Sequence, residues 1–408
     1  MLRSRMETGW PAGPQKNVDS MPEGSCVWRN PHLRGRIPEL DGIRGLAILL
    51  VLVWHYVCGS KTHYGIQGRL SDVLVPLNLS WSGVDLFFVL SGFLIGGILL
   101  DAKHVDSYYG TFYLRRLHRI FPLYFIWLGL FLVGLYLWNQ DAALFNHDLP
   151  VWPYFLFLQN VFVVSNFTFG AGWMLVTWSL AVEEQFYILL PFAIRKLSSK
   201  GIVRLAVGAI LFAPVVRFVF VMLGKNYGPY TLLPCRADAL GVGVLLALGC
   251  RNQEIWAWFV SHRKEIYITF VALGLGLVVF IVHPRDRLLN TVGYSWLAMF
   301  YTSLLLLVLV NPGRMERLVF RNLVLVRLGT IAYAVYIFHQ GINGLLQYAL
   351  QGTIPTGWTW CISVLSLATV LILAEVSWRV LESPLIRRAH SKYQYVTEAS
   401  EPPVTVLA

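Results

Sequence analysis

Apolar windows long enough to cross a membrane recur along the whole chain, and they constrain its fold more than any other feature. They lie at residues 43–58, 83–100, 119–138, 174–194, 202–223, 236–250, 266–282, 294–310, 327–349 and 359–381. A helix needs about 20 apolar residues to span a bilayer, where only helices and closed barrels satisfy their own backbone hydrogen bonds. The hydrophobic fraction is 56% and the charged fraction is 13%. These observations predict an all-α, polytopic integral membrane protein with about ten transmembrane helices.

Basic residues are distributed unevenly between the loops. With the N-terminus in the cytoplasm, the outer loops hold only Lys61, Arg69, Lys225, Arg285 and Arg287. The positive-inside rule then predicts that both termini are cytoplasmic, in a multi-pass protein of the cell (inner) membrane. This topology accounts for the net charge of +11, so we expect a lipid bilayer and no nucleic acid as partner.

The segment between the third and fourth windows, residues 150–165, reads PVWPYFLFLQNVFVVS. We interpret it as interfacial or re-entrant, because a further span there would disturb the alternation of basic residues between the two sides of the membrane. The two ends of the chain are polar. We expect residues 1–36 to be a flexible cytoplasmic segment, 37–388 to be the transmembrane domain, and 389–408 to be a flexible cytoplasmic tail.

The five cysteines have neither CxxC spacing nor the spacing of metal ligands, so no metal site is expected. Three of them, Cys58, Cys235 and Cys361, map near the outer membrane surface in this topology. One disulfide among these three remains an open alternative to free thiols.

Asp41, Arg44 and His55 share one face of the first window, in the sequence RIPELDGIRGLAILLVLVWHY. At about 100° per residue, the eleven steps from Arg44 to His55 return the side chain to within about 20°. The rise of ~1.5 Å per residue separates the two by roughly 16 Å along the helix axis. One face of this helix is therefore suited to hold an anion near one membrane surface and to perform chemistry near the other.

Ionisable residues within spans are costly and mark functional sites by default. The topology sorts them into two tiers with His339 close to mid-membrane. The cytoplasmic tier contains Asp41, Arg44, Arg115, Arg116, His118, Arg119, Glu375, Arg379 and Glu382, and the outer tier contains His55, Asp85, Glu183, Glu184, Arg236 and Asp238. For His339 we favour a hydrogen-bonded core histidine, and for Glu375 and Arg379 a structural i,i+4 ion pair.

Arg115, Arg116 and Arg119 stand just before Pro122, a residue typical of the first turn of a helix. The pattern therefore predicts that these guanidinium groups lie at a helix N-terminus, where planar, bidentate donors and the helix dipole favour phosphate. The alternative is that they are positive-inside anchors. For His55 the favoured role is catalytic, because neutral histidine is a general base near neutral pH and a carboxylate can orient its ring.

Seven stretches carry a resemblance to a known family. In order they are LDGIRGLAILLVLVWH, GVDLFFVLSGFLIGGIL, RRLHRIFPLY, WSLAVEEQFYILLP, RADALGVGVLLA, LGTIAYAVYIFHQ and LESP. Together, from Ile37 to Pro384, they resemble the acyltransferase 3 family of integral-membrane acyltransferases, whose bacterial members O-acylate surface sugars. The departures are small: Ile43 stands where Leu is commoner, and Ala332 and Ala334 stand where Ser is commoner.

The resemblance implies an O-acyltransferase that moves an acyl group, with acetyl the first choice, from cytoplasmic acyl-CoA. The acceptor would be a hydroxyl of a sugar, glycan or glycolipid at the outer face, and no permanently bound cofactor is implied. Donor phosphates would contact Arg115, Arg116 and Arg119, with Arg44 near the inner end of the pantetheine arm.

The same resemblance assigns roles at the outer end. The thioester would arrive near His55, which would either deprotonate the acceptor or carry the acyl group itself. We expect Glu184 to be its carboxylate partner, and Asp41 to belong to the same catalytic stripe. Acceptor-binding candidates are Asp85, Glu183, Arg236 and Trp178; tryptophans such as Trp178 also serve as ordinary interface anchors.

A transporter or exporter of a small or glycolipid substrate is the principal alternative, because ten spans and charges at several depths also suit transport. No inverted internal repeat is visible in the sequence. A membrane sensor or scaffold is a second alternative, and it predicts that replacing His55 with Ala is harmless.

Overall fold

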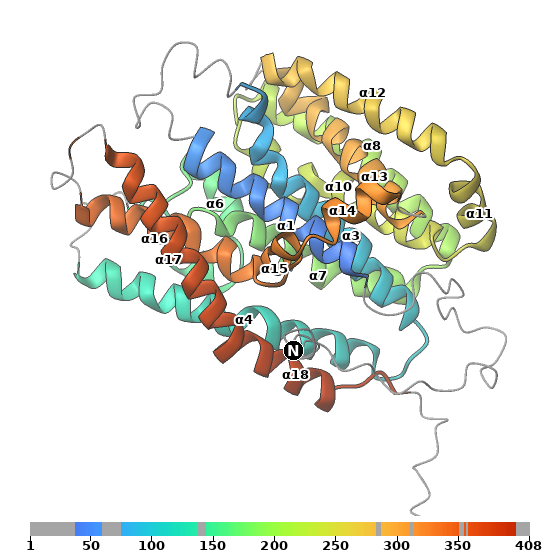
Figure 1. Ribbon diagram of the computed structural model, residues 1–408. Coiled ribbons are helices and arrows are strands. Elements are labelled where there is room, and N and C mark those ends of the chain that lie inside the picture. Colours follow the sequence, from blue (N-terminus) through green and yellow to red (C-terminus); the bar gives the residue numbers. More distant parts are fainter. Residues whose placement is uncertain are drawn as a thin grey trace, which may run out of the picture.

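The computed structural model describes residues 37–58, 75–137, 144–282, 287–310, 313–350, 355 and 358–396, and within these ranges the chain is helical with no β-strand. Figure 1 shows α1 and α3 running through the middle of the bundle. One flank contains α8, α10, α12 and α13, and the other contains α4, α16, α17 and α18. The predicted all-α class is confirmed.

The first half of the chain contains α1 (Pro38–Val53), the π-helical turn η3 (Trp54–Cys58), the 3-10 helix η4 (Val75–Ser82), α3 (Gly83–Asp101), α4 (Tyr108–Leu137), α5 (Trp152–Phe155), α6 (Gln159–Asn166), α7 (Thr177–Lys196) and α8 (Ser199–Met222). The second half contains α9 (Gly228–Thr231), α10 (Leu233–Gly249), α11 (Gln253–Ser261), α12 (Arg263–Val282), η5 (Leu289–Gly293), α13 (Tyr294–Leu309), α14 (Arg314–Phe320), α15 (Leu323–Thr330), α16 (Ala332–Leu350), α17 (Thr359–Ser377), η7 (Trp378–Glu382) and α18 (Ser383–Lys392).

Each of the ten apolar windows falls on helical structure, and the window 327–349 covers the end of α15 and most of α16. In the described part of the chain, seven helical segments are long and apolar enough to cross a membrane, or up to eight if α15 and α16, which meet at a 76° bend, form one broken span. The other two windows correspond to α7 and α12, with 20 residues each. The polytopic membrane protein predicted from the sequence is confirmed.

The ambiguous segment 150–165 contains two short helices, α5 with 4 residues and α6 with 8. Neither approaches the length of about 20 residues that a span needs. Phe157, between them, has a positive φ of 54°, and so does Phe167 directly after α6. This irregular backbone is tied to the bundle, because the side-chain amide of Gln185 on α7 donates to the Phe157 carbonyl over 2.9 Å.

Small residues allow α3 and α10 to cross closely at the centre of the bundle. A Cβ atom on Gly92 would lie 2.1 Å from the backbone oxygen of Leu240, and one on Gly243 would lie 2.3 Å from that of Val89. Membrane helices use such glycines because apolar lipid supplies no hydrophobic force to hold helices together, so close packing must do so. The crossing fixes α3, which carries Asp85 and Ser91, against α10.

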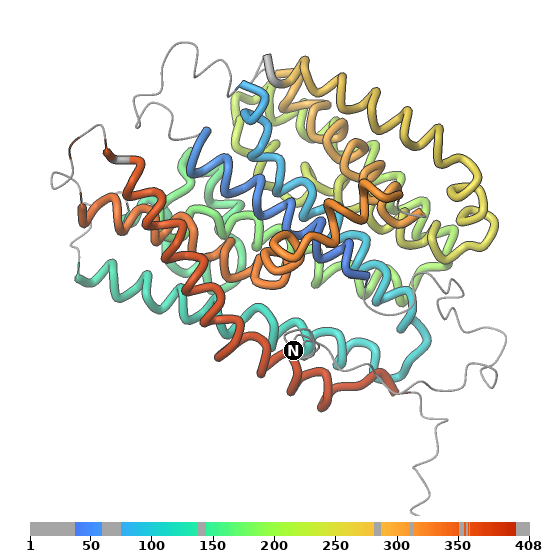
Figure 2. The backbone as a smooth tube through the Cα atoms, viewed as in Figure 1, coloured from blue at the N-terminus to red at the C-terminus, as the bar shows by residue number. Residues whose placement is uncertain are grey.

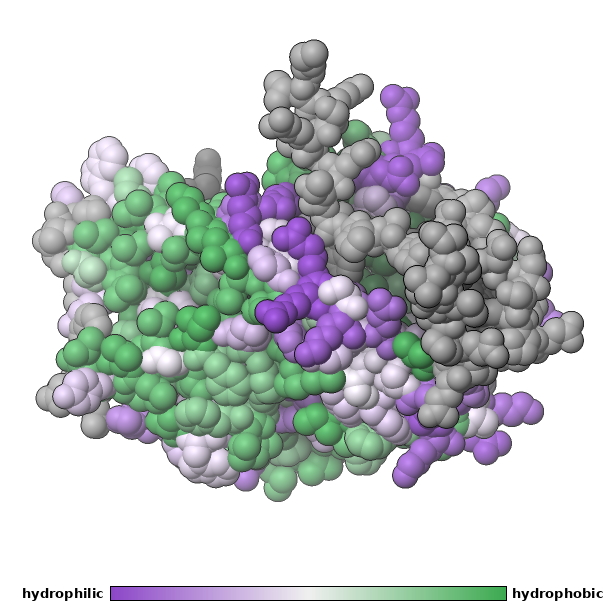
Figure 3. Space-filling view, turned by 90° about the horizontal axis from the view of Figure 1, so that it is seen from below, coloured by the Kyte–Doolittle hydropathy of each residue, from purple (hydrophilic) through white to green (hydrophobic). Residues whose placement is uncertain are grey.

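The exterior is strongly apolar. Figure 3 shows a broad hydrophobic area on one face of the molecule, with hydrophilic residues gathered beside it. Large apolar side chains are exposed along two helices of this flank, including Leu130 and Val133 on α4 and Ile372 and Val376 on α17. Apolar area of this kind is expected of a protein whose surrounding solvent is lipid rather than water.

The C-terminal end differs from the sequence-based division. The tail was predicted to begin at residue 389, but α18 continues to Lys392, and Figure 2 shows it running beside α4. Beyond it, the Gln394 carbonyl accepts hydrogen bonds of 3.0 Å from the hydroxyls of Ser107 and Thr111. Long-range packing therefore orders residues whose local composition is merely polar.

Two further expectations can be compared with the described residues. Cys58, Cys235 and Cys361 are free thiols, so the alternative of a disulfide among them is not realised. Glu375 and Arg379 form the predicted i,i+4 ion pair at 2.5 Å. Arg327 of α15 contacts the same carboxylate at 2.5 Å, which joins α15 to α17.

Candidate active site

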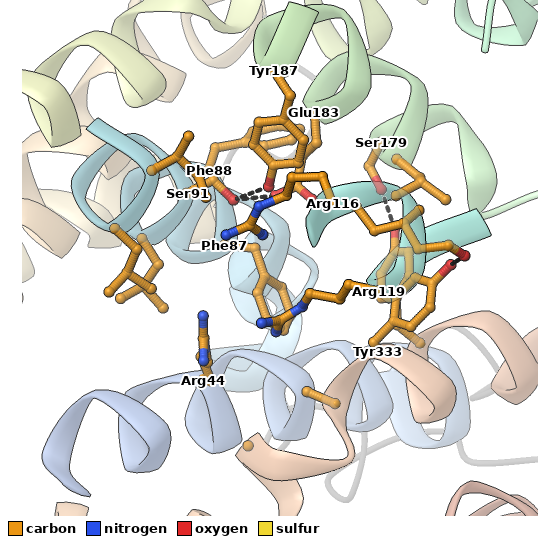
Figure 4. Close-up of a pocket in the computed structure, with 18 of the residues that line it drawn as sticks. Arg44, Phe87, Phe88, Ser91, Arg116, Arg119, Ser179, Glu183, Tyr187 and Tyr333 are labelled. Atoms are coloured by element: carbon orange, nitrogen blue, oxygen red, sulfur yellow. Dashed lines mark hydrogen bonds between the residues drawn. The ribbon is translucent and has the colours of Figure 1, made fainter. Parts of the chain in front are cut away.

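A pocket opens where α1, α3, α4, α7, α16 and the η7–α18 segment meet, and it encloses about 1010 Å³ including space open to solvent. Figure 4 shows Arg44 from α1 and Arg116 and Arg119 from α4 directed into the same space. Glu183 and Tyr187 of α7 stand beside Arg116, on the side opposite Arg44. Its lining is Arg44, Val84, Phe87, Phe88, Leu90, Ser91, Leu94, Ile95, Arg116, Arg119, Ile120, Ser179, Leu180, Glu183, Tyr187, Gly329, Thr330, Ala332, Tyr333, Tyr336, Trp378, Glu382 and Ile386.

Arg44 is positioned by a close crossing of α1 and α15. A Cβ atom on Gly45 would lie 1.9 Å from the Leu325 backbone oxygen, and one on Gly329 would lie 1.8 Å from that of Asp41. Only glycine fits at these contacts, because real Cβ atoms do not approach a backbone oxygen so closely. Asp41, on the same turn, forms an ion pair of 3.5 Å with Arg44. The glycines of the motif LDGIRG therefore set the depth at which Arg44 meets the pocket.

The arginines of α4 sit in a different local structure from the one expected. Because α4 begins at Tyr108, Pro122 lies inside the helix and the arginines lie well within it, so the predicted helix N-terminus is wrong. Membrane helices tolerate interior proline when neighbouring groups satisfy the backbone. Arg116 and Arg119, one turn apart, both line the pocket. A phosphate would be held here by side-chain charge and not by a helix dipole.

Neither Arg116 nor Arg119 forms an ion pair with a carboxylate anywhere in the described ranges. Both guanidinium groups instead interact electrostatically with Arg44, and the interaction is repulsive. Three guanidinium groups and two carboxylates, those of Glu183 and Glu382, line this space, so positive charge is in excess. An excess of positive charge removed from water favours a bound anion.

Arg115 stands apart from the other two arginines. Its Nε donates to the Tyr393 carbonyl over 2.8 Å, and its guanidinium lies 5.0 Å from the centre of the Tyr395 ring. It is absent from the pocket lining. Burial raises the pKa of the Tyr395 hydroxyl, while Arg115 and Arg116 act in the opposite direction. The structure thus uses Arg115 to hold the C-terminal segment, in contrast to the predicted phosphate contact.

A polar wall of the pocket lies beside Arg116. The Ser91 hydroxyl donates to the Glu183 carboxylate and lies 3.1 Å from the Tyr187 hydroxyl. The Tyr187 ring is 5.5 Å from the Arg116 guanidinium. Glu183 had been placed in the outer tier by sequence depth, yet it lines the same pocket as Arg116. Ser91, from the motif GVDLFFVLSGF, is the residue that joins α3 to α7 at this wall.

Glu184 is buried, and its Oε1 has no hydrogen-bond partner among the described residues. Its electrostatic neighbours are Glu183 and Arg116. No hydrogen bond joins it to His55 in the described part of the chain, so the expected pairing of these two residues is not present in this structure. Neighbouring residues on a helix point about 100° apart, which lets Glu183 face the pocket while Glu184 faces the protein interior.

His55 lies beyond the far end of the pocket. Tyr336 lines the pocket, its hydroxyl is 2.5 Å from that of Ser179, and its ring centre is 5.6 Å from that of His339. His339 in turn meets His55, with Nε2 3.3 Å from His55 Nδ1. The α-helix of the first window ends at Val53, and His55 occupies the π-helical turn η3. Such turns are frequent at functional sites.

Asp85, Arg236 and Trp178 are packed inside the bundle. Asp85 and Arg236 form an ion pair with both side chains 0% exposed. Arg236 lies 4.1 Å from the centre of the Tyr294 ring, and Trp178 packs on Tyr230 with ring centres 4.4 Å apart. None of the three predicted acceptor-binding residues lines the pocket. A second buried pair joins Arg217 to Asp238 at 2.9 Å, and its arginine was not singled out from the sequence.

Several residues that line the pocket were not predicted from the sequence. Ser179 and Tyr336 are neutral hydroxyl groups, which hydropathy and charge do not single out. The motifs WSLAVEEQFY and LGTIAYAVYIFHQ do contain Ser179, Tyr333 and Tyr336, so motif position was the available signal. Glu382, within LESP, lines the pocket and accepts from Ser377 over 2.9 Å.

Known proteins match most of this chain. A family model described as an acyltransferase domain matches residues 37–375. The O-acetyltransferase OatA of Staphylococcus aureus (strain NCTC 8325 / PS 47) is 25% identical over 398 residues, covering 88% of this chain and 59% of the relative. A protein named a putative O-acetyltransferase from Staphylococcus aureus (strain COL) is 26% identical over 386 residues, covering 85% of this chain and 57% of the relative.

The chain thus spans about three fifths of the length of these curated relatives. No solved structure matches it. The family match covers most of the residues that form the bundle, including six of the seven sequence stretches and every arginine of the pocket; the seventh stretch, LESP, lies beyond it. On that evidence this chain belongs to the acyltransferase domain family, the acyltransferase 3 family of the resemblance above.

Proposed function

We propose that this protein transfers an acyl group, acetyl in the first instance, from acyl-CoA to a hydroxyl of a sugar, glycan or glycolipid. The relatives' names specify O-acetyl transfer, and the donor, the acceptor and the sidedness are our additions. The donor would enter from the cytoplasm, the acceptor would lie at the outer face, and both termini would be cytoplasmic in the inner membrane.

The observation that carries the proposal is the convergence of three guanidinium groups on one pocket. Arg44, Arg116 and Arg119 come from two helices, and the two on α4 have no ion-pair partner among the described residues. Guanidinium groups bind phosphate oxygens in pairs of parallel hydrogen bonds, which is the chemistry that the phosphates of CoA require. A donor without anionic groups would leave the excess positive charge of this pocket unmatched.

The apolar part of the pocket suits the pantetheine arm of acyl-CoA. Beyond the arginines the lining is largely apolar, with Phe87 and Phe88 of α3 and Leu180 of α7. It then reaches Ser179 and Tyr336, whose neighbour His339 contacts His55. Pockets that fix a ligand through a few polar groups in an apolar wall are usual for small molecules. A pantetheine arm on this path would bring its thioester toward the histidines.

His55 is the proposed catalytic residue. As a neutral base it would take the proton from the acceptor hydroxyl while the oxygen attacks the thioester carbonyl; the acyl–sulfur bond then breaks and the CoA thiolate takes the proton back. In the alternative route His55 attacks the thioester first and the acceptor then attacks acyl-histidine. Both routes consume one acyl-CoA and one hydroxyl and yield the ester and free CoA.

Transfer of radiolabelled acetyl from acetyl-CoA tests the proposal directly. Membranes would contain the wild type, His55→Ala, or the control His262→Ala, whose histidine lies between α11 and α12, outside the pocket lining. We expect label in envelope glycans with the wild type and the control, and loss of about 10²–10⁴-fold with His55→Ala, the usual contribution of a general base. Longer acyl-CoAs would identify the donor if acetyl-CoA fails.

Sealed vesicles of the two orientations test the sidedness. Acyl-CoA added outside inverted vesicles reaches the cytoplasmic face, so we expect transfer there and none with right-side-out vesicles. If no acyl-CoA supports transfer and His55→Ala behaves as the wild type in every assay, the acyltransferase proposal fails and the transporter alternative takes its place.

A further inference from the structure

The contact between His339 and His55 joins two spans that are far apart in sequence. His339 Nε2 lies 3.3 Å from His55 Nδ1, and the ring centres are 4.8 Å apart at 58°. His339 is 0% exposed. Sequence reasoning treated it as a core histidine and assigned it no part in the chemistry. The geometry, however, limits which ring nitrogens of the two histidines carry hydrogen.

Two carbonyl groups determine the tautomers. His55 Nδ1 lies 2.9 Å from the Val51 carbonyl oxygen, and His339 Nδ1 lies 2.7 Å from that of Tyr336. A carbonyl oxygen only accepts, so in each neutral ring the hydrogen sits on Nδ1. His339 Nε2 is then an unprotonated acceptor, and it faces the Nδ1–H of His55. The Nδ1–H of His55 is shared between Val51 and His339, which leaves Nε2 as the basic nitrogen of His55.

His339 is held firmly enough to serve this purpose. Its backbone oxygen accepts from the Tyr56 hydroxyl over 3.0 Å, and that hydroxyl is 3.0 Å from the Ser366 hydroxyl of α17. Tyr56 follows His55 directly in the turn η3. The turn that carries His55 is therefore tied to α16 through both its histidine and its tyrosine, so ring orientation at His55 depends on His339.

From these contacts we propose that His339 is a positioning residue for His55; this inference rests on the proposed acyl transfer. His339 takes the part that a carboxylate plays in many catalytic triads. It accepts the Nδ1–H of His55 and keeps the basic Nε2 directed to the substrate. When Nε2 gains the acceptor's proton, His339 and the Val51 carbonyl stabilise the imidazolium through Nδ1–H. The proton returns to the CoA thiolate as the acyl–oxygen bond forms and the acyl–sulfur bond breaks.

The test compares His339→Leu with His339→Gln in membranes, using acetyl transfer from acetyl-CoA. Gln places an amide oxygen near the position of Nε2 and keeps the acceptor, whereas Leu removes it. We expect kcat to fall about 10–100-fold with Leu and to stay within a few-fold of the wild type with Gln. KM for acetyl-CoA should be unchanged in both, because the arginines are untouched. His262→Leu controls for loss of a histidine elsewhere.

Wild-type kcat with His339→Leu would overturn the inference. Equal loss in His339→Gln and His339→Leu, with both proteins folded by thermal unfolding in detergent, would overturn it as well. Should the Leu variant fail to fold, His339→Asn replaces it, since Asn places its amide near Nδ1 and not near Nε2; activity of Gln well above Asn supports the inference, and equal activity overturns it.

The inference and the proposed function fail in different ways. Transfer by the wild type and by His339→Leu, but not by His55→Ala, would contradict the positioning role alone. Absence of transfer by the wild type with every acyl-CoA would remove both together.

Discussion

Two groups of arginines lie inside the bundle, and they differ in what surrounds their charges. Arg217 and Arg236 are each 0% exposed and each paired with an aspartate, Asp238 and Asp85 respectively. Arg116 and Arg119 border an open pocket and have no ion-pair partner among the described residues. The sequence-based prediction treated Arg236, Arg116 and Arg119 alike as ligand contacts and did not single out Arg217, whereas the surroundings of the two groups differ in the structure.

Charge matching explains the difference. Arg236 is paired with a carboxylate on another helix and lies 4.1 Å from the centre of the Tyr294 ring, so it joins helices, although its Nε and Nη1 have no hydrogen-bond partner among the described residues. The guanidinium groups of the pocket outnumber the carboxylates that line it, so an entering anion would stabilise them. The partners of these arginines, and not their depth, thus distinguish the helix-joining pair from the two that we propose to bind the donor.

The largest expected effect is on stability at the buried pair. Asp85→Ala leaves the Arg236 charge uncompensated, which costs about 3–5 kcal/mol in the folded state. We expect little folded protein in detergent, with a strongly lowered thermal midpoint measured by fluorescence-detected size exclusion. Replacing both residues, Asp85→Leu with Arg236→Met, should recover much of that loss. A stable, inactive Asp85→Ala would instead favour the acceptor-binding role expected from the sequence.

The next effect is on donor binding. Arg116→Ala combined with Arg119→Ala removes two charge-assisted contacts, each worth about 1.5–3 kcal/mol, so KM for acyl-CoA should rise at least about 10²-fold. Thermal stability should change little, because neither side chain forms an ion pair with the residues that the structure describes. Arg115→Ala, one residue away on α4, is the matched control. Equal KM values for the double variant and the wild type would rule out this phosphate site.

A smaller effect tests how Arg44 is positioned. In Gly45→Ala the new Cβ would meet the Leu325 backbone oxygen at 1.9 Å, so α1 and α15 must separate. Overpacking of this kind costs about 1–3 kcal/mol, and we expect a raised KM for acyl-CoA together with a lower thermal midpoint. Gly110→Ala, where a Cβ would meet nothing within 4 Å, is the control. An unchanged KM for acyl-CoA in Gly45→Ala would mean that the crossing of α1 and α15 does not position Arg44 for donor binding.

The smallest effect concerns the C-terminal segment. Arg115→Ala removes the hydrogen bond to the Tyr393 carbonyl and the contact with the Tyr395 ring. A cation–π contact at a partly exposed site contributes about 0.5–1 kcal/mol. We expect faster limited proteolysis after residue 392 and acyl transfer within about twofold of the wild type. A large rise in KM for acyl-CoA would instead support the predicted contact between Arg115 and the donor phosphates.

Much of the candidate site was visible in the sequence, but its connections were not. Arg44, Arg116, Arg119 and Glu183 were all singled out, and all line the pocket. The pairing of His55 was expected with Glu184, whereas the structure places His339 there. Helical phase relates residues within one span, and it carries no information about which other span packs against them.

The position of α4's start illustrates the same limit. Pro122 is a good indicator of a helix start in soluble proteins, and it predicted a helix beginning near Arg119. In the structure α4 extends back to Tyr108. Residues of the first turns, such as Tyr108 and Phe112, are buried against neighbouring helices. Packing therefore outweighed the local signal.

The sequence by itself determined the class of protein and the inventory of charges. Apolar windows must become helices in lipid because no other open structure satisfies the backbone there, and intramembrane charges are few enough to identify one by one. Tertiary structure alone decided which charges meet. The glycine crossings, the pairing of Arg236 with Asp85 and the contact of His339 with His55 all depend on distances between spans. Such distances follow from the packing of many side chains together, and no local pattern encodes them.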